Sequence, residues 1–252
     1  MAKVRDGQHF ETVAAVYGSA RPAYPGVLYE TLEQQGVIGR GRRVLEIGAG
    51  SGEATVELVR RGSAVVAVEP GTELVARLRR ACPDVSVAAA RIEEVDLSEG
   101  QFNSVVAATA MHWVDLPTML PTIARALRPQ GFLAVWRTVY GDPRVQTPFR
   151  TAVAQIVNAR DESPSPSDPL DPRPTVDELE AGGWFRLVRT WQWSWQIDLT
   201  AAQLRSLFAT FSDWTDPGEL QEVHAAAQAQ RGPVTEHYVT ILHVLQGATE
   251  EP

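Results

Sequence analysis

The chain contains a single cysteine, Cys82, among 252 residues. This excludes a disulfide framework and a cysteine-rich metal site, because both need several thiols. The sequence also lacks an apolar stretch long enough to span a bilayer, and its first residues lack the apolar region of a secretory signal. We therefore expect a cytoplasmic protein with no membrane partner.

Basic residues are also scarce: 23 Lys and Arg stand against 31 Asp and Glu, a net charge of −8. Because nucleic-acid binding draws its affinity from Lys and Arg on phosphates, we expect no nucleic-acid partner. His237 and His243 have no third candidate ligand nearby in sequence, so we predict no metal site. The hydrophobic content of 44% suits an α/β domain with a full core. We expect a monomer or a homodimer.

A glycine-rich turn is the most informative stretch that is present. The apolar run 44–47 ends in Gly48-Ala49-Gly50-Ser51-Gly52, and residues with helical spacing follow from Ala54. A strand, a tight turn and a helix in this order offer a polar ligand free N–H groups and positions without a Cβ. The pattern favours a nucleotide-like ligand; the alternative is a turn that binds nothing.

A carboxylate, Glu46, precedes this turn by two residues. A dinucleotide fingerprint G-x-G-x-x-G beginning at Gly48 would need glycine at position 53, which is Glu53. A carboxylate repels a pyrophosphate but attracts the amino group and the sulfonium of S-adenosylmethionine. The residues therefore favour S-adenosylmethionine as the ligand.

The segment 44–52 closely resembles the first motif of the class I S-adenosylmethionine-dependent methyltransferases. The resemblance implies a Rossmann-like, doubly wound, mostly parallel sheet of seven strands, with S-adenosylmethionine as methyl donor and S-adenosylhomocysteine as product. The chain agrees, because strand-like runs and helical segments alternate through about a hundred residues after the turn.

Further cofactor contacts are expected along the same sheet edge. Glu69 ends the apolar run 64–68, 21 positions after Gly48, where an acid takes the ribose hydroxyls. Residues 90–94 occupy the adenine-binding position of the family, where Arg91 replaces the usual Asp, so contact is expected through the backbone of Arg91 and Ile92 or through Glu93. The predicted cofactor residues are Arg21, Glu46, Gly48, Ala49, Gly50, Gly52, Glu69, Pro70, Arg91, Ile92, Glu93 and Thr109.

The predicted fourth strand and its exit loop, residues 102–113, end in His112 and Trp113. Ligands of open parallel sheets sit beyond the carboxyl ends of the strands, so Thr109, His112 and Trp113 should face the site. The segment 111–114 looks like one shared by trans-aconitate, juvenile hormone acid and plant salicylate and jasmonate carboxyl methyltransferases. In the last two groups the Trp indole donates to the substrate carboxylate beside an N-terminal Gln, roles that the resemblance gives to Trp113 and Gln8.

We therefore predict a small-molecule methyltransferase with His112 and Trp113 as catalytic residues, acting on a carboxylate. A carboxylate is already ionised at pH 7 and needs donors rather than a base. One alternative is a phenol or amine acceptor with His112 as the base. Another is a module that binds the cofactor without transferring methyl.

A single domain over 1–252 is predicted, with a helical lid (1–35), a cofactor core (36–140), a cap with a proline-rich loop (141–183) and C-terminal strands and helices (184–252). The lid resembles that of small-molecule methyltransferases: Arg21 would reach the methionine carboxylate, and Gln8, Tyr17, Tyr24 and Trp113 would bind substrate. Trp191, Trp193 and Trp195 alternate with polar residues, which predicts a strand whose aromatic face is core or part of an acceptor pocket.

Overall fold

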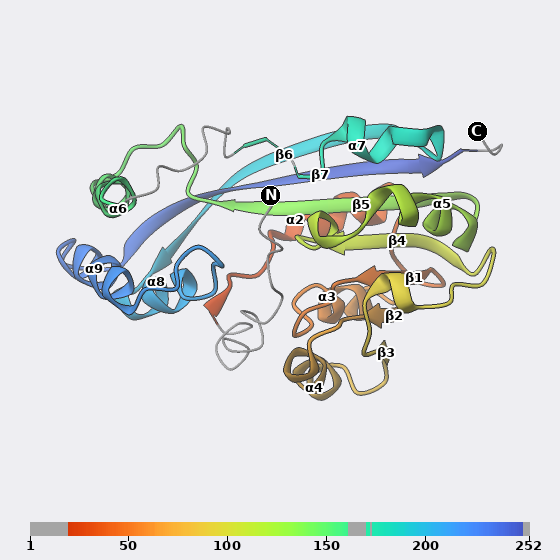
Figure 1. Cartoon of the computed structure of the whole chain (residues 1–252), viewed down its shortest axis with the longest axis horizontal. Helices are drawn as coiled ribbons and strands as arrows, with labels where there is room; N and C mark the ends of the chain where they lie inside the picture. Colours follow the sequence, from red (N-terminus) through yellow and green to blue (C-terminus); the bar gives the residue numbers. More distant parts are fainter. Residues whose placement is uncertain (1–19, 161–169, 172, 249–252) are drawn as a thin grey trace. The chain divides into compact units, whose positions relative to one another are not determined.

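The computed structural model describes residues 20–160, 170–171 and 173–248 (Figure 1). The chain divides into a larger unit (23–138, 172–193 and 240–252) and a smaller unit (1–22, 139–171 and 194–239). These boundaries cut across the segments expected from the sequence, since residues 184–252 contribute to both units. The predicted lid helix over 8–21, with Gln8 and Tyr17, lies almost wholly outside the described residues.

The seven strands form one sheet in the order β3-β2-β1-β4-β5-β7-β6. Their bounds are β1 Arg43–Ile47, β2 Ala64–Val68, β3 Ser86–Ala88, β4 Phe102–Ala108, β5 Leu127–Tyr140, β6 Phe185–Leu199 and β7 Val234–Gly247. The pairs β1–β2, β1–β4, β2–β3 and β4–β5 are parallel, whereas β7 runs opposite to β5 (Figure 1). The predicted fold class, a mostly parallel seven-stranded sheet, is confirmed.

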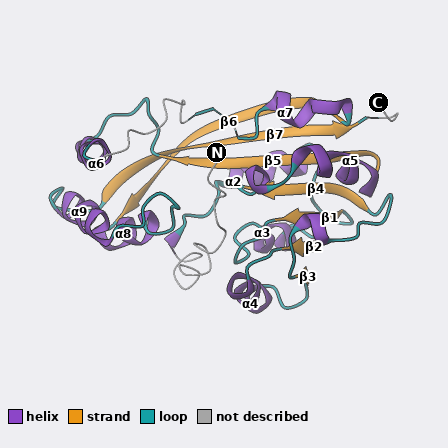
Figure 2. Cartoon of the chain, viewed as in Figure 1, coloured by secondary structure: helices purple, strands orange, loops and turns teal. Residues whose placement is uncertain are grey.

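Helices alternate with the strands along the chain, as the sequence predicts (Figure 2). Those of the larger unit are α2 Gly26–Gln34, α3 Thr55–Arg60, α4 Thr72–Ala81, α5 Leu116–Ala126 and α7 Val176–Glu180, with the 3₁₀ turns η1 Ile92–Glu94, η2 Met111–Trp113 and η3 Ala181–Gly183. Those of the smaller unit are α6 Pro148–Asn158, α8 Ala201–Phe208 and α9 Pro217–Gln228. The sequence analysis did not predict α7 or the three short turns.

Each face of the central strands carries its own apolar core, because successive side chains of a strand point to opposite sides. Leu45 lies in register with Val66 and Val105, and this face packs against α5. Val44 belongs to the opposite face, which packs against α2 and α3. The central strands are therefore buried on both sides, and Glu46 is the one charged residue of β1 that is fully buried.

The predicted tryptophan strand is confirmed as β6. Its three tryptophans are half-buried, and Trp191 and Trp193 pack on the α2–α3 face of the larger unit. Trp195 packs instead in the core of the smaller unit. The aromatic face is thus largely core, and a role in lining an acceptor pocket stays a prediction.

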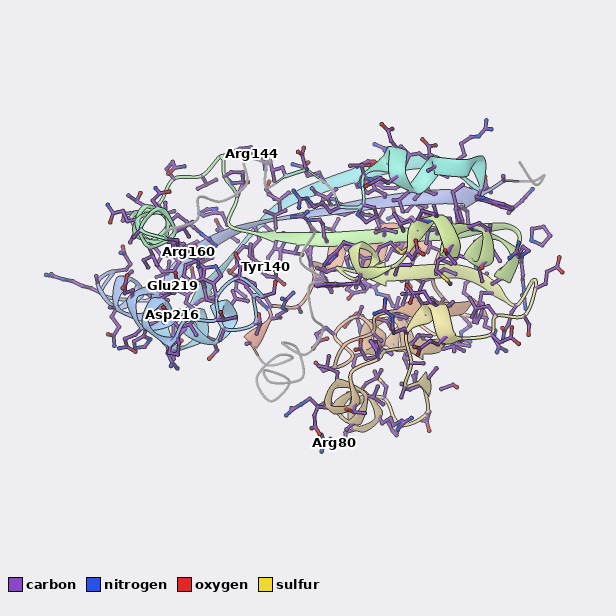
Figure 3. All side chains as sticks on the ribbon, viewed as in Figure 1. Arg80, Tyr140, Arg144, Arg160, Asp216 and Glu219 are labelled. Carbon is purple, nitrogen blue, oxygen red and sulfur yellow. The ribbon has the colours of Figure 1, made fainter. Side chains whose placement is uncertain are left out.

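The smaller unit is built around Phe149, Phe208 and Tyr238, which α6, α8 and β7 contribute to one apolar cluster. Two ion pairs hold its elements together. Arg150 pairs with the fully buried Glu236 on β7, and Arg160 makes two 2.7 Å hydrogen bonds to Glu219 on α9 (Figure 3).

Candidate cofactor and methyl-transfer site

The glycine turn after β1 requires its glycines. Gly48, Gly50 and Gly52 all have positive φ, at +66°, +60° and +104°. A Cβ on Gly48 would lie 2.4 Å from the Cβ of Ala110, and one on Gly52 would lie 2.9 Å from Cδ1 of Leu78. The positive φ disfavours other residues at all three positions, and the lack of space does so at Gly48 and Gly52, so this turn has a bare backbone surface of the kind that a ligand can approach.

Glu69 fastens this turn to the end of β2. One carboxylate oxygen accepts the N–H of Gly50 and the other accepts the N–H of Gly71, both at 2.9 Å. The backbone adds a second tie, because the carbonyl of Val68 accepts the N–H of Gly48 at 2.8 Å. Each carboxylate oxygen has two lone pairs, so Glu69 can hold the turn and still accept a hydroxyl. Its predicted ribose contact fits this geometry and stays a prediction.

Glu46 lies behind the turn and is fully enclosed by protein. One of its carboxylate oxygens accepts the hydroxyl of Thr55 at 2.6 Å, and the other has no hydrogen-bond partner within the described residues. Burial raises the pKa of the Glu46 carboxyl to about 8; the Thr55 bond opposes the rise, and the nearby Glu53 and Glu69 add to it. A buried acceptor without a partner fits a site for a cationic ligand.

The exit of β4 is held in a strained conformation. Thr109 has φ +57°, which is rare for a β-branched residue and costs about 1–3 kcal/mol. Two bonds hold it there: its N–H donates to the carbonyl of Trp136 at 2.7 Å, and its hydroxyl lies 3.3 Å from that of Tyr24. The Tyr24 ring stands edge-on to Trp136, with centroids 5.9 Å apart. Such strain is typical of functional sites.

His112 and Trp113 follow in η2. Their rings lie 4.9 Å apart at 42°, with His112 exposed and Trp113 half-buried. The near contact between Gly48 and Ala110 brings the β4 exit against the glycine turn. The structure thus brings together the predicted residues Gly48, Glu69 and Thr109 at the carboxyl edge of the sheet.

The segment predicted to bind adenine forms η1. Arg91 is exposed and Ile92 is buried in the core, while Glu93 reaches out of the segment. One Glu93 oxygen accepts the N–H of Asp115 at 3.1 Å, and the other lies 3.5 Å from Nε of Arg91. Pro70 is exposed directly after Glu69. The adenine contacts of these residues stay predictions.

Arg21 belongs to the smaller unit. Its Nε and Nη2 donate to the hydroxyl and the carbonyl of Thr210, both at 3.2 Å. Its guanidinium also lies 5.5 Å from the ring centre of Tyr140. Its predicted contact with the cofactor carboxylate stays a prediction, as do the roles of Gln8 and Tyr17, which lie outside the described residues.

Two supporting residues were missed by sequence reasoning. Thr55 binds Glu46 from the first position of α3, and Trp136 supports both Tyr24 and Thr109. The only sequence signal for Thr55 is weak: it is a hydroxyl residue at the start of the helix that follows the turn. Trp136 reads as an ordinary core residue of a strand and gave no signal.

Within the described ranges, no three His, Cys, Asp or Glu side chains are grouped so that they could hold a metal ion. None of the helices in that part of the chain is long and apolar enough to cross a membrane.

Known proteins with similar sequences identify the family. Residues 45–135 match the methyltransferase domain family. An uncharacterized methyltransferase of Mycobacterium tuberculosis is 35% identical over 204 residues, which are 81% of this chain and 76% of that protein. The chain belongs to the class I S-adenosylmethionine-dependent methyltransferases.

Two further similarities concern the fold and one part of the sequence. A candidate type II methyltransferase from Anaeromyxobacter dehalogenans has the same fold, with a TM-score of 0.67 at 24% identity over 89% of this chain and 97% of that chain. The malonyl-[acyl-carrier protein] O-methyltransferase of Halorhodospira halophila is 33% identical over 121 residues, 46% of this chain and 40% of that protein.

S-adenosylmethionine is the cofactor of this methyltransferase, and when bound it supplies a methyl group on a sulfonium sulfur. The residues present fit such a group. The glycine turn exposes backbone without side chains, Glu69 supplies acceptors for hydroxyls, and the buried Glu46 carboxyl has one oxygen without a partner among the described residues.

The Gly48 contact gives a first prediction. We expect Gly48→Ala to abolish binding of S-adenosylhomocysteine by calorimetry and to lower the free energy of unfolding by about 2–5 kcal/mol, from positive φ plus overpacking on Ala110. Gly41 also has positive φ (+79°) but open space around it, so Gly41→Ala should lose only about 1–2 kcal/mol. The double variant Gly48→Ala/Ala110→Gly should recover most of the difference. A double variant that is as unstable as Gly48→Ala would contradict the steric explanation.

The buried Glu46 carboxyl predicts a pH dependence of stability. Its pKa is raised by folding, so the proton it holds stabilises the folded state fully below about pH 4.5, and this stabilisation is lost as the pH rises through about 8. Glu46→Gln, which stays neutral, should remove this loss. Thr55→Val removes a hydrogen bond that lowers the pKa of Glu46, so it should extend the loss to higher pH. Urea unfolding at a series of pH values measures both, and equal slopes for wild type and Glu46→Gln would contradict the prediction.

Proposed function

We propose that this methyltransferase acts on a small molecule and methylates a carboxylate oxygen. Its main support is Trp113, which lies half-buried in the short turn after the central strand β4, three residues beyond Ala110, the residue that lies against the glycine turn. An indole N–H only donates hydrogen bonds, so it suits an acceptor that is already an anion.

The chemistry of a carboxylate agrees with the groups present. At pH 7 it is ionised, so the protein need not remove a proton before transfer. The acceptor oxygen forms a new bond to the methyl carbon while the carbon–sulfur bond breaks, and the electron pair stays on sulfur. The protein's task is then to hold the oxygen in line with that bond and to exclude water.

A relative adds support for this acceptor class. The protein of Halorhodospira halophila that matches 46% of this chain is named for O-methylation of a malonyl group. The oxygen of a carrier-bound malonyl group that can be methylated is that of its free carboxylate. The similarity favours a carboxylate acceptor and leaves open which acid this chain takes.

His112 supports a second candidate, a phenol or amine acceptor. Its ring is exposed and lies 4.9 Å from that of Trp113 in the same turn. A phenol or amine holds a proton at pH 7 that must leave during transfer, and histidine is the side chain suited to take it. The two candidates therefore differ in which residue of η2 carries the reaction.

A labelled-methyl screen over small carboxylic acids, phenols and amines tests the proposal. We expect transfer to an acid, giving a product that releases labelled methanol in mild alkali, as esters do and methyl ethers and N-methyl amines do not. Trp113→Phe should lower kcat/KM by about 30-fold through loss of a hydrogen bond to a charged group, whereas His112→Ala should change it less than about threefold. Alkali-stable product and the reverse order of effects would establish the second candidate instead.

A further inference from the structure

The turn that carries Trp113 is anchored at both ends. At its start, Thr109 donates its N–H to the carbonyl of Trp136 at 2.7 Å. At its end, Asp115 donates its N–H to a carboxylate oxygen of Glu93 at 3.1 Å. Between them, the N–H groups of Trp113 and Val114 donate to the carbonyls of Ala110 and Met111 in the same turn. The two outer bonds therefore tie the backbone of this turn to β5 and to the loop after β3.

The second anchor comes from a distant part of the sheet. Glu93 follows β3, whereas Asp115 follows β4, and the strand order places β2 and β1 between those two strands. Neighbouring strands are about 4.8 Å apart, so β3 and β4 are separated by about 14 Å. The Glu93–Asp115 bond thus joins the loops that leave the two strands on either side of the strands β1 and β2, whose ends form the cofactor site.

Arg91 explains how Glu93 is held in this position. Its Nε lies 3.5 Å from the second Glu93 oxygen, and the Glu93 side chain is about three-quarters buried, with 22% of its surface exposed. The family resemblance expects an Asp at position 91, and an acid there would repel Glu93 instead of holding it. An arginine at position 91 is therefore compatible with the Glu93–Asp115 hydrogen bond, whereas the Asp of the family pattern would oppose it.

We propose that Glu93 is a positioning residue that couples the adenine side of the cofactor site to the Trp113 turn. Its contact with Asp115 fixes the end of the turn, so occupation of the η1 side by the cofactor is transmitted to the indole that faces the acceptor. Arg91 keeps the Glu93 carboxylate in this orientation. The inference rests on the proposed function in giving Trp113 the acceptor, but the coupling itself is measurable without any acceptor.

The test uses the full chain labelled with 5-fluorotryptophan, with the ¹⁹F resonance of Trp113 assigned by its loss in Trp113→Phe. Saturating S-adenosylhomocysteine should shift this resonance in the wild type. In Glu93→Ala the ligand is added to saturation, as judged by calorimetry, and the shift at saturation should fall below half of the wild-type shift. Glu93→Gln, which keeps an oxygen for the Asp115 N–H, should preserve most of the shift.

Two variants of Asp115 test the same hydrogen bond if Glu93→Ala folds poorly. Asp115 has φ −72° and follows an extended residue, so Asp115→Pro removes the N–H donor without changing the backbone. Asp115→Ala removes the side chain and keeps that donor. The coupling predicts a reduced Trp113 shift in Asp115→Pro and a normal one in Asp115→Ala.

Glu94 provides the neighbouring control, because its carboxylate accepts the N–H of Arg91 within its own turn. Glu94→Ala should leave the Trp113 shift unchanged. A full shift in both Glu93→Ala and Asp115→Pro would overturn the proposal. Absence of ligand binding to the wild type would instead overturn the cofactor assignment, so the two failures are distinguishable.

Discussion

The site depends on the carboxylate of Glu69, which accepts the backbone N–H groups of Gly50 and Gly71. This one side chain joins the turn after β1 to the end of β2, at the edge where open parallel sheets bind ligands. A charge-assisted bond to backbone is stronger than a neutral one, so the turn is held before a ligand arrives. A carboxylate at position 69 thus serves the fold, and its contact with the ligand stays a prediction.

The two carboxyl groups next to this turn, those of Glu69 and Glu46, differ in their hydrogen-bond partners. Glu69 has partners for both oxygens, whereas Glu46, behind the turn, has a partner for only one and a pKa raised by burial. The enclosed carboxyl favours a proton or a cation, which suits the amino group and sulfonium of the methyl donor. The end of β4 lies against the same turn, because Ala110 packs on Gly48 at a distance that leaves no space for a Cβ. Thr109, the residue before Ala110, has a strained backbone with positive φ.

Much of this arrangement could be predicted from the sequence because its signals are local. The glycine spacing, the apolar run before it and the acid ending the next run predict a strand, a turn and a ligand edge, and the structure confirms the fold. The bonds of Tyr24 to Thr109 and Glu93 to Asp115 were not predictable, because contacts between segments far apart in the sequence leave no periodicity. The two compact units leave no local signal either, since β5, β6 and β7 each contribute residues to both, and the single domain over 1–252 stays a prediction.

The most direct measurement is a calorimetric titration of the wild type, Glu69→Gln and Glu69→Ala with S-adenosylhomocysteine. The wild type should bind one equivalent of the ligand. Glu69→Ala should bind about 30-fold more weakly, the effect of losing a charged hydrogen-bond partner worth about 2 kcal/mol, and Glu69→Gln should fall between them. A wild type that does not bind, or a Glu69→Ala variant that binds as tightly as the wild type, would contradict the account.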